Sequence, residues 1–187
     1  LRSAVGLTYA RERQPRCGGV LIAQDMILTA AHWLCRHTPQ YAFIGENPFD
    51  ASNPQPRLYY RLGASLAKSP PCANLAAAGM VDVAVIRIQG SVDKAPPIAF
   101  ADGRTIDATR AFRIVGYGAT DRAGTTTDFL KRQAMVGAVS HRCSPSDQAN
   151  YVCHQDQEIV AGRPGSADSC RGDSGSPLLI ERLVDGQ

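Results

Sequence analysis

Short apolar runs separated by turn-forming residues are the feature that most constrains how this chain folds. The runs are rich in Val, Ile and Leu and cover residues 20–22, 26–28, 41–44, 81–88, 112–115, 135–139 and 178–180. Gly, Pro, Asn or Asp separates most of them, which is typical of strands joined by tight turns. Helix signals are sparse, with one Ala-rich helical turn expected at residues 75–80. The pattern predicts an all-β sandwich or barrel.

The charge balance argues against two classes of partner. The 187-residue chain has 20 Lys and Arg residues against 17 Asp and Glu residues, a formal net charge of +3. Because the basic residues are scattered rather than gathered in a stripe, we expect neither a nucleic acid nor an anionic membrane as a partner. No run approaches the roughly 18 consecutive apolar residues that a membrane-spanning helix needs.

The cysteines carry information about the compartment. Six of them lie at positions 17, 35, 72, 143, 153 and 170. None forms a Cys-x-x-Cys pair, so zinc sites and thioredoxin-type redox sites are poor interpretations. An even number at wide spacing favours disulfides and an oxidising compartment. The alternative is a set of buried free thiols, because a free cysteine behaves as a small hydrophobic residue.

The strongest local signal is Gly172-Asp173-Ser174-Gly175-Ser176-Pro177. An activated serine needs an exposed hydroxyl on a tight turn, and glycines permit both the turn and the close approach of a substrate carbonyl. In such a turn the N–H groups of Gly172 and Ser174 can converge on a developing oxyanion. The alternative is an ordinary Gly/Ser turn, since short motifs match by chance.

Two further residues could complete a catalytic group with Ser174. His32 follows three small residues at 29–31, which let the chain turn and present the imidazole. Asp82 heads an apolar strand and could accept a hydrogen bond from His32. Taken singly, His32 could be a structural or surface histidine, the interpretation that we keep for the other three histidines. Asp82 could merely cap its strand or lie in solvent.

The order His, Asp, Ser differs from that in subtilisins and α/β-hydrolases. Residues 17–22, 28–32, 82–86, 115–118 and 168–175 resemble sequence blocks of the trypsin/chymotrypsin family, with Tyr117 where many members have Trp. The blocks span most of the chain in the right order. The resemblance implies two antiparallel six-stranded β-barrels. Residues 1–100 would form the first and carry His32 and Asp82, and residues 101–187 would form an incomplete second barrel that carries Ser174.

The chemistry implied by the resemblance is that of a serine endopeptidase. Ser174 would attack the peptide carbonyl, His32 would act as general base, and Asp82 would orient His32. The N–H groups of Gly172 and Ser174 would form the oxyanion hole. This chemistry needs no metal or organic cofactor. The implied partners are polypeptide substrates and protein protease inhibitors.

The resemblance also suggests a substrate preference. In the family, the residue six before the nucleophile lies at the base of the pocket for the side chain preceding the cut, and here it is Asp168. A buried carboxylate there would select Arg or Lys. Ser169 and Arg171 would also contact substrate, Arg171 from the rim. The alternative is that Asp168 is a solvated loop residue, because segment 155–167 is longer than usual for the family.

The disulfide pairs implied by the resemblance are Cys17–Cys35, bracing the loop that bears His32, and Cys143–Cys153, closing a short loop. Cys170 normally pairs with a cysteine beyond the end of this chain, and Cys72 has no obvious family partner. The two either pair with each other or are both free, and we favour cysteines that are free or partnered elsewhere.

The chain departs from the family at both ends. Only 16 residues precede Cys17, so the amine that normally pairs with Asp173 and fixes the oxyanion turn is expected to be missing. Residues 4–7 look like the first strand, and the last expected strands are absent. A longer secreted, extracellular or periplasmic parent is the favoured interpretation. The competing function is a zymogen-like or inactive protease-fold protein with a binding or regulatory role.

Overall fold

The computed structural model describes residues 2–9, 14–49, 58–69, 82–93, 95–151, 153–162 and 166–180. The chain divides into two compact units. Unit 1 comprises Leu1–Ala99, Val115–Arg132 and Ser169–Pro177, and unit 2 comprises Phe100–Ile114, Gln133–Asp168 and Leu178–Gln187. Unit 1 therefore contains all three candidate catalytic residues. The two-barrel division near residue 100 stays a prediction.

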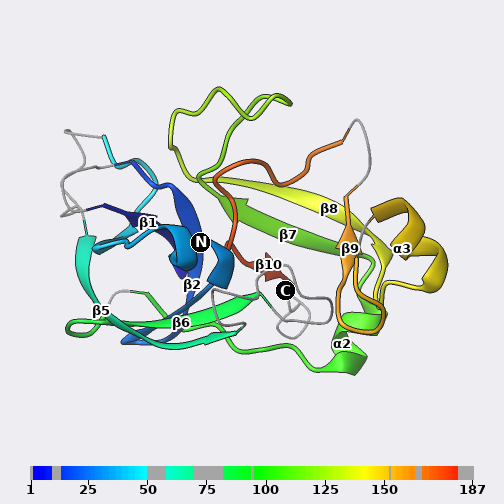
Figure 1. Ribbon diagram of the computed structural model, residues 1–187, viewed down its shortest axis with the longest axis horizontal. Coiled ribbons are helices and arrows are strands. Elements are labelled where there is room, and N and C mark those ends of the chain that lie inside the picture. Colours follow the sequence, from blue (N-terminus) through cyan, green and yellow to red (C-terminus); the bar gives the residue numbers. More distant parts are fainter. Residues whose placement is uncertain are drawn as a thin grey trace, which may run out of the picture. The chain divides into compact units, whose positions relative to one another are not determined.

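Unit 1 is built on a closed antiparallel barrel (Figure 1). Closure leaves none of the six strands with an open edge. Around the barrel the strand order is β1-β2-β3-β6-β5-β4. The strands are β1 (Ala4–Thr8), β2 (Cys17–Ala23), β3 (Met26–Thr29), β4 (Tyr41–Ile44), β5 (Leu58–Ser69) and β6 (Val83–Ile88).

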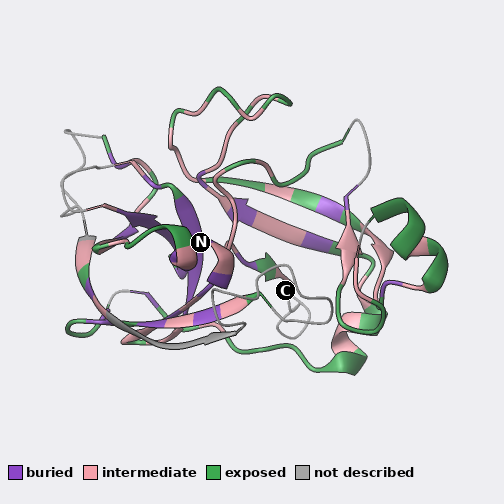
Figure 2. Ribbon diagram, in the orientation of Figure 1, coloured by how far each residue is buried: buried purple, intermediate pink, exposed green. Residues whose placement is uncertain are grey.

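Alternating burial along the strands forms the barrel core. Every second residue of β3 is buried, and β6 has the same alternation, so Ile27, Ile86 and Ile88 point inward at 0–3% exposure. Strand β2 differs because its first five residues are all buried (Figure 2). Residues covered on both faces indicate that another segment packs on the outside of β2.

A second sheet has the order β10-β7-β8-β9 and is not closed within the described residues. Its strands are β7 (Ala111–Gly116), β8 (Arg132–Ser140), β9 (Val160–Ala161) and β10 (Leu178–Leu179). The short helix α2 (Gly103–Ala108) precedes β7 in the sequence, and a second short helix, α3 (Pro145–Tyr151), lies between β8 and β9. The predicted all-β class, with one complete and one incomplete barrel, is confirmed.

Most predicted strands are found within one to three residues of their predicted ends. The 12-residue strand β5 was not predicted, and its pairing with β6 shifts register between Leu62 and Ser65 and again between Ser65 and Ala67. Such irregularities break the alternation on which a strand prediction depends. The predicted helical turn at 75–80 lies outside the described residues. In the part of the chain that the structure describes, no helix is long and apolar enough to span a membrane.

The barrel core gives a first testable prediction. Ile27 is fully buried, so Ile27→Ala removes apolar contacts and leaves a cavity. We expect the free energy of unfolding, measured by chemical denaturation, to fall by about 2–5 kcal/mol. Met135→Ala is the control, because Met135 is 49% exposed and its truncation should cost less than about 0.5 kcal/mol. Equal losses in the two variants would contradict the assigned core.

Candidate active site

The register of two neighbouring strands brings His32 and Asp82 together. Thr29 at the end of β3 pairs with Ala84 at the start of β6. His32 follows three residues after Thr29, in the first turn of helix α1 (Ala31–Arg36), and Asp82 precedes Ala84 by two residues. The two side chains therefore emerge at the same edge of the barrel.

Asp82 holds His32 through both carboxylate oxygens. Oδ1 accepts the backbone N–H of His32 at 2.7 Å, and Oδ2 contacts Nδ1 of the imidazole. The side chains are 43% and 46% exposed, so the pair is accessible to solvent. With Nδ1 engaged as donor, the ring is oriented and Nε2 is left as the nitrogen that can accept a proton.

Ser174 lies on a double turn whose two glycines have backbone angles that favour glycine. Gly172 and Gly175 have φ angles of +99° and +79°, a region that side chains disfavour. The N–H of Asp173 donates to the carbonyl of Cys170 at 2.9 Å, and the N–H of Ser176 donates to the carbonyl of Asp173 at 2.8 Å. The expected tight turn around the serine is therefore present.

This turn packs against the outside of β2 and the end of β3. The N–H of Gly18 donates to the Ser174 carbonyl at 2.8 Å, and the Cys17 thiol contacts the same oxygen at 2.7 Å. A Cβ on Gly175 would lie 2.3 Å from the Thr29 hydroxyl, and a Cβ on Gly18 would lie 1.9 Å from that of Ser176. The serine turn is thus seated against the chain that leads into His32. No hydrogen bond joins the Ser174 hydroxyl to His32 in this structure.

Two backbone donors in the turn remain available. Within the part of the chain that the structure describes, the N–H groups of Gly172 and Ser174 have no acceptor, whereas that of Asp173 is used inside the turn. Oxyanion stabilisation requires N–H donors that are free in this way, and this role of Gly172 and Ser174 stays a prediction.

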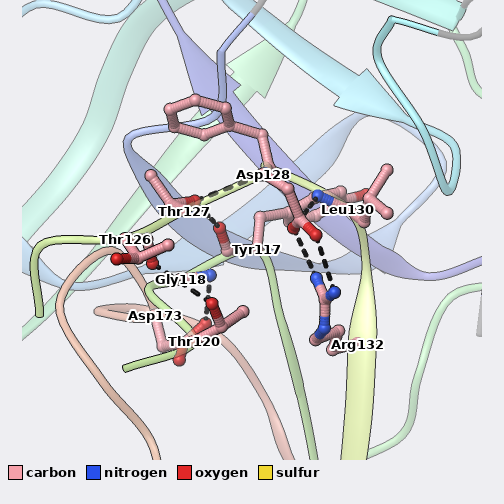
Figure 3. A network of polar contacts seen from close by, with 10 residues as sticks. Tyr117, Gly118, Thr120, Thr126, Thr127, Asp128, Leu130, Arg132 and Asp173 are labelled. Carbon is pink, nitrogen blue, oxygen red and sulfur yellow. Dashed lines mark hydrogen bonds and ion pairs between the residues drawn. The ribbon is translucent and has the colours of Figure 1, made fainter. Parts of the chain in front are cut away.

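Backbone atoms form a cradle around the Asp173 carboxylate, and Figure 3 shows its contact with Gly118. Its oxygens accept the N–H of Gly118 at 2.8 Å and the N–H of Cys170 at 2.9 Å. A Cβ on Gly116 would lie 1.9 Å from Oδ1, and a Cβ on Gly118 would lie 2.5 Å from the carboxylate carbon. The cradle therefore exists because residues 116 and 118 are glycines.

The predicted substrate-binding residues lie along one exposed stretch. Asp168 and Ser169 are exposed, and so is Arg171, whose carbonyl accepts the N–H of Ala119 at 2.8 Å. A Cβ on Gly162 would lie 3.1 Å from the Asp168 carboxylate, so Asp168 lies beside the chain that follows β9. The role of these three residues in binding substrate stays a prediction.

The predicted Cys17–Cys35 disulfide is wrong. Cys17 is a free thiol at 0% exposure, and Cys35 is disulfide-bonded elsewhere. The Cys17 sulfur faces the Ser174 carbonyl. Cys35 is a half-exposed residue of helix α1, next to the buried Leu34. Burial raises the pKa of the Cys17 thiol to about 12, which keeps it protonated.

The remaining cysteines fall into place separately. Cys143 and Cys153 form a disulfide with their Cα atoms 6.0 Å apart, the pairing that the resemblance suggested. Cys170 is free and half-buried. Cys72 lies outside the described residues.

The sequence analysis did not foresee the contacts that Thr29 and Tyr117 make beside the site. Thr29 is 3% exposed and donates its hydroxyl to the Gly18 carbonyl at 2.7 Å, which ties β3 to β2 beside the serine turn. Tyr117 is 2% exposed and donates its hydroxyl to the Gly45 carbonyl at 2.6 Å. Desolvation raises the pKa of Tyr117, so its hydroxyl stays protonated as a donor. The Gly18-Gly19 pair was a visible signal, since paired glycines in a strand mark a close approach of another backbone.

Comparisons with known proteins place this arrangement in a class. The family model described as Trypsin matches residues 2–186. The chain is 27% identical over 183 residues to a trypsin of Saccharopolyspora erythraea, covering 92% of this chain and 74% of that protein. It is 25% identical to granzyme A of Bos taurus and 27% identical to chymotrypsin-like elastase family member 1 of Rattus norvegicus, covering 91% of this chain in both cases. It spans 67% and 64% of those two relatives.

The fold agrees with a solved structure. The mouse brain serine protease neuropsin superposes with a TM-score of 0.73 at 23% identity, over 95% of this chain and 77% of that one. The fold is thus that of the trypsin-like serine proteases. With the family model matching nearly the whole chain, this protein belongs to the trypsin family.

The cysteine assignment gives a second prediction. In the native protein, an alkylating reagent should leave Cys17 unmodified, because the thiol is buried and its pKa is about 12. After denaturation without reduction, Cys17 should be alkylated, and peptide mapping by mass spectrometry should recover Cys143 linked to Cys153. Recovery of a Cys17–Cys35 linked peptide would contradict the assignment.

Proposed function

We propose that the full protein is a serine endopeptidase that hydrolyses polypeptides through an acyl-enzyme. Ser174 is the nucleophile, His32 the general base, and Asp82 the residue that orients His32. The proposal depends on one observation: Asp82 contacts His32 at two places, the backbone N–H and Nδ1 of the ring. A carboxylate that engages only Nδ1 of the ring leaves Nε2 for proton transfer.

The reaction follows from these groups. Nε2 of His32 takes the proton of the Ser174 hydroxyl as its oxygen bonds to the peptide carbonyl carbon. The carbonyl oxygen becomes an oxyanion that the N–H groups of Gly172 and Ser174 stabilise. His32 then gives the proton to the leaving amine, the C–N bond breaks, and an ester to Ser174 remains. Water, deprotonated by His32, hydrolyses the ester and restores the serine.

Asp82 contributes through charge and geometry. His32 becomes a cation when it takes the serine proton, and the adjacent carboxylate stabilises that cation. The second bond, to the backbone N–H of His32, fixes where the first turn of α1 begins relative to Asp82. The imidazole therefore has little freedom to rotate away from its orientation.

The proposed substrates carry Arg or Lys before the cleaved bond. Asp168 supplies the carboxylate, six residues before Ser174. A carboxylate in a binding pocket attracts a cationic side chain and leaves an apolar one beside an unpaired charge. Ser169 and Arg171 are proposed to contact the same substrate, and protein protease inhibitors are proposed partners.

Oxidising surroundings fit this function. The Cys143–Cys153 disulfide and the disulfide-bonded Cys35 support a location outside the reducing cytosol, in secreted, extracellular or periplasmic space. Nucleic acid and membranes are not proposed as partners, since the net charge is only +3.

A second candidate function is a zymogen-like or inactive protease-fold protein that binds or regulates. One observation favours it. Within the described residues Asp173 is held by two backbone N–H groups and by no cationic side chain. If an unpaired carboxylate makes the turn rest in an inactive form, turnover would require an activating step.

Covalent labelling separates the two candidates. With the full-length protein, a serine-directed phosphonate should modify Ser174, and a peptide ester with Arg before the cut should be hydrolysed. Ser174→Ala should abolish labelling and turnover. Asp82→Asn should lower kcat by about 10⁴-fold, because the ring would take the wrong tautomer. Ser166→Ala, at an exposed serine outside the proposed group, is the matched control. If Ser174 is not labelled and the peptide ester is not hydrolysed under activating conditions, the enzyme proposal is rejected.

Substrate preference is tested at Asp168. Peptide esters that differ only in Arg, Lys, Phe or Leu before the cut should be ranked by kcat/KM, with Arg and Lys highest. Asp168→Ser should lower kcat/KM for Arg esters by at least about 10²-fold, because the cation loses its charged partner. Activity on Phe esters should change far less. Preferred cleavage after Phe or Leu in the unmodified protein would reject the role of Asp168 and leave the enzyme proposal standing.

A further inference from the structure

The two ends of the segment from Tyr117 to Lys131 are attached to two adjacent residues that follow barrel strand β4. At one end, the Tyr117 hydroxyl donates to the Gly45 carbonyl at 2.6 Å. At the other end, the backbone N–H of Lys131 donates to the Glu46 carbonyl at 2.7 Å. Gly45 and Glu46 directly follow strand β4, so the segment is fixed to the barrel wall at a single turn.

Tyr117 is the buried member of this attachment. The ring packs edge-on against Phe43, with centroids 5.9 Å apart, and the Lys131 ammonium lies 5.5 Å from the Tyr117 centroid. Lys131 is half-buried, and the desolvation lowers the pKa of its ammonium to about 8. A hydroxyl buried to this degree needs a hydrogen-bond partner, and the Gly45 carbonyl supplies it.

The neighbours of Tyr117 on both sides hold the Asp173 carboxylate. Gly118 donates its N–H to Asp173, and Gly116 leaves the space that the carboxylate fills. Asp173 is in turn the residue between Gly172 and Ser174, whose N–H groups are the proposed oxyanion donors. Figure 3 shows Tyr117, Gly118 and Asp173 in one polar network, in which Thr127 also donates its hydroxyl to the Tyr117 carbonyl at 3.4 Å.

We propose that Tyr117 is a positioning residue for the oxyanion turn, the turn of residues 172–174. Its hydroxyl acts through the hydrogen bond to the Gly45 carbonyl. The bond fixes the backbone of residues 116–118 on the barrel, the fixed backbone holds Asp173, and Asp173 sets the direction of the N–H groups of Gly172 and Ser174. Many family members carry Trp at the position of Tyr117. Because Trp has no hydroxyl, they cannot make this bond to the Gly45 carbonyl. The inference rests on the proposed function, since the turn must stabilise an oxyanion for its position to affect a rate.

The test is Tyr117→Phe in the full-length protein, which removes one oxygen and keeps the ring. Kinetics are normalised to active sites titrated with the phosphonate, so unfolded molecules do not count. We expect kcat to fall by roughly tenfold, less than the 10²–10³-fold cost of deleting an oxyanion donor, with KM unchanged within about twofold. Amide hydrogen exchange of residues 116–119 and 171–175, measured by mass spectrometry, should become faster.

The matched control is Tyr151→Phe, at a 44% exposed tyrosine of α3, which should change neither readout. A Tyr117→Phe protein with wild-type kcat per titrated site would overturn the inference, whatever its thermal stability, because a merely structural residue alters only the folded fraction. Absence of turnover in the unmodified protein would reject the proposed function instead. In that case, amide hydrogen exchange of the Tyr117→Phe protein tests the inference. Faster exchange at residues 171–175 supports the link from Tyr117 to Asp173, and unchanged exchange overturns the inference.

Discussion

The seating of the serine turn on strand β2 is the contact on which the rest of the site depends. It is made by backbone: the N–H of Gly18 donates to the Ser174 carbonyl, and the close approach is possible because neither Gly18 nor Gly175 has a side chain. A backbone contact of this kind tolerates no insertion of atoms. It explains why β2 is buried on both faces, and it joins residues that are more than 150 positions apart in the chain into one compact unit.

From that contact, the position of His32 follows through strand pairing. Thr29 reaches from β3 to the Gly18 carbonyl and simultaneously pairs with Ala84 of β6, so β2, β3 and β6 are in fixed register beside the serine turn. Asp82 and His32 leave these strands within three residues of the register pair. A slip of one residue would turn every side chain of a strand to the opposite face and separate them. The barrel therefore positions Asp82 and His32 through the hydrogen-bonded pairing of its strands.

Residue pattern and resemblance were sufficient for the fold class and most strands, and they named His32 and Asp82, which the structure brings into contact. The roles of the site residues stay predictions. Pattern and resemblance failed where the outcome depends on contacts across the chain. Strand β5 was missed because two register shifts interrupt its alternation. The resemblance implied a Cys17–Cys35 disulfide, but a sequence does not show which way a sulfur points, and the Cys17 sulfur faces the Ser174 carbonyl instead. Thr29 and Tyr117 lie in sequence blocks that resemble the family, but the partners of their hydroxyl groups, the carbonyls of Gly18 and Gly45, became visible only in the structure.

The charge of Asp173 connects the competing functions to the architecture of the turn. A carboxylate that accepts two backbone N–H groups is satisfied in hydrogen bonds but not neutralised in charge, and burying it has a free-energy cost that only a cation offsets fully. Local structure offsets part of this cost. Gly116 and Gly118 leave space for the carboxylate, and the Tyr117–Gly45 bond holds the backbone beside Gly118, whose N–H donates to Asp173. The proposed endopeptidase requires this frame alone to hold the N–H groups of Gly172 and Ser174 in line, whereas the zymogen-like candidate requires an added positive charge to complete it.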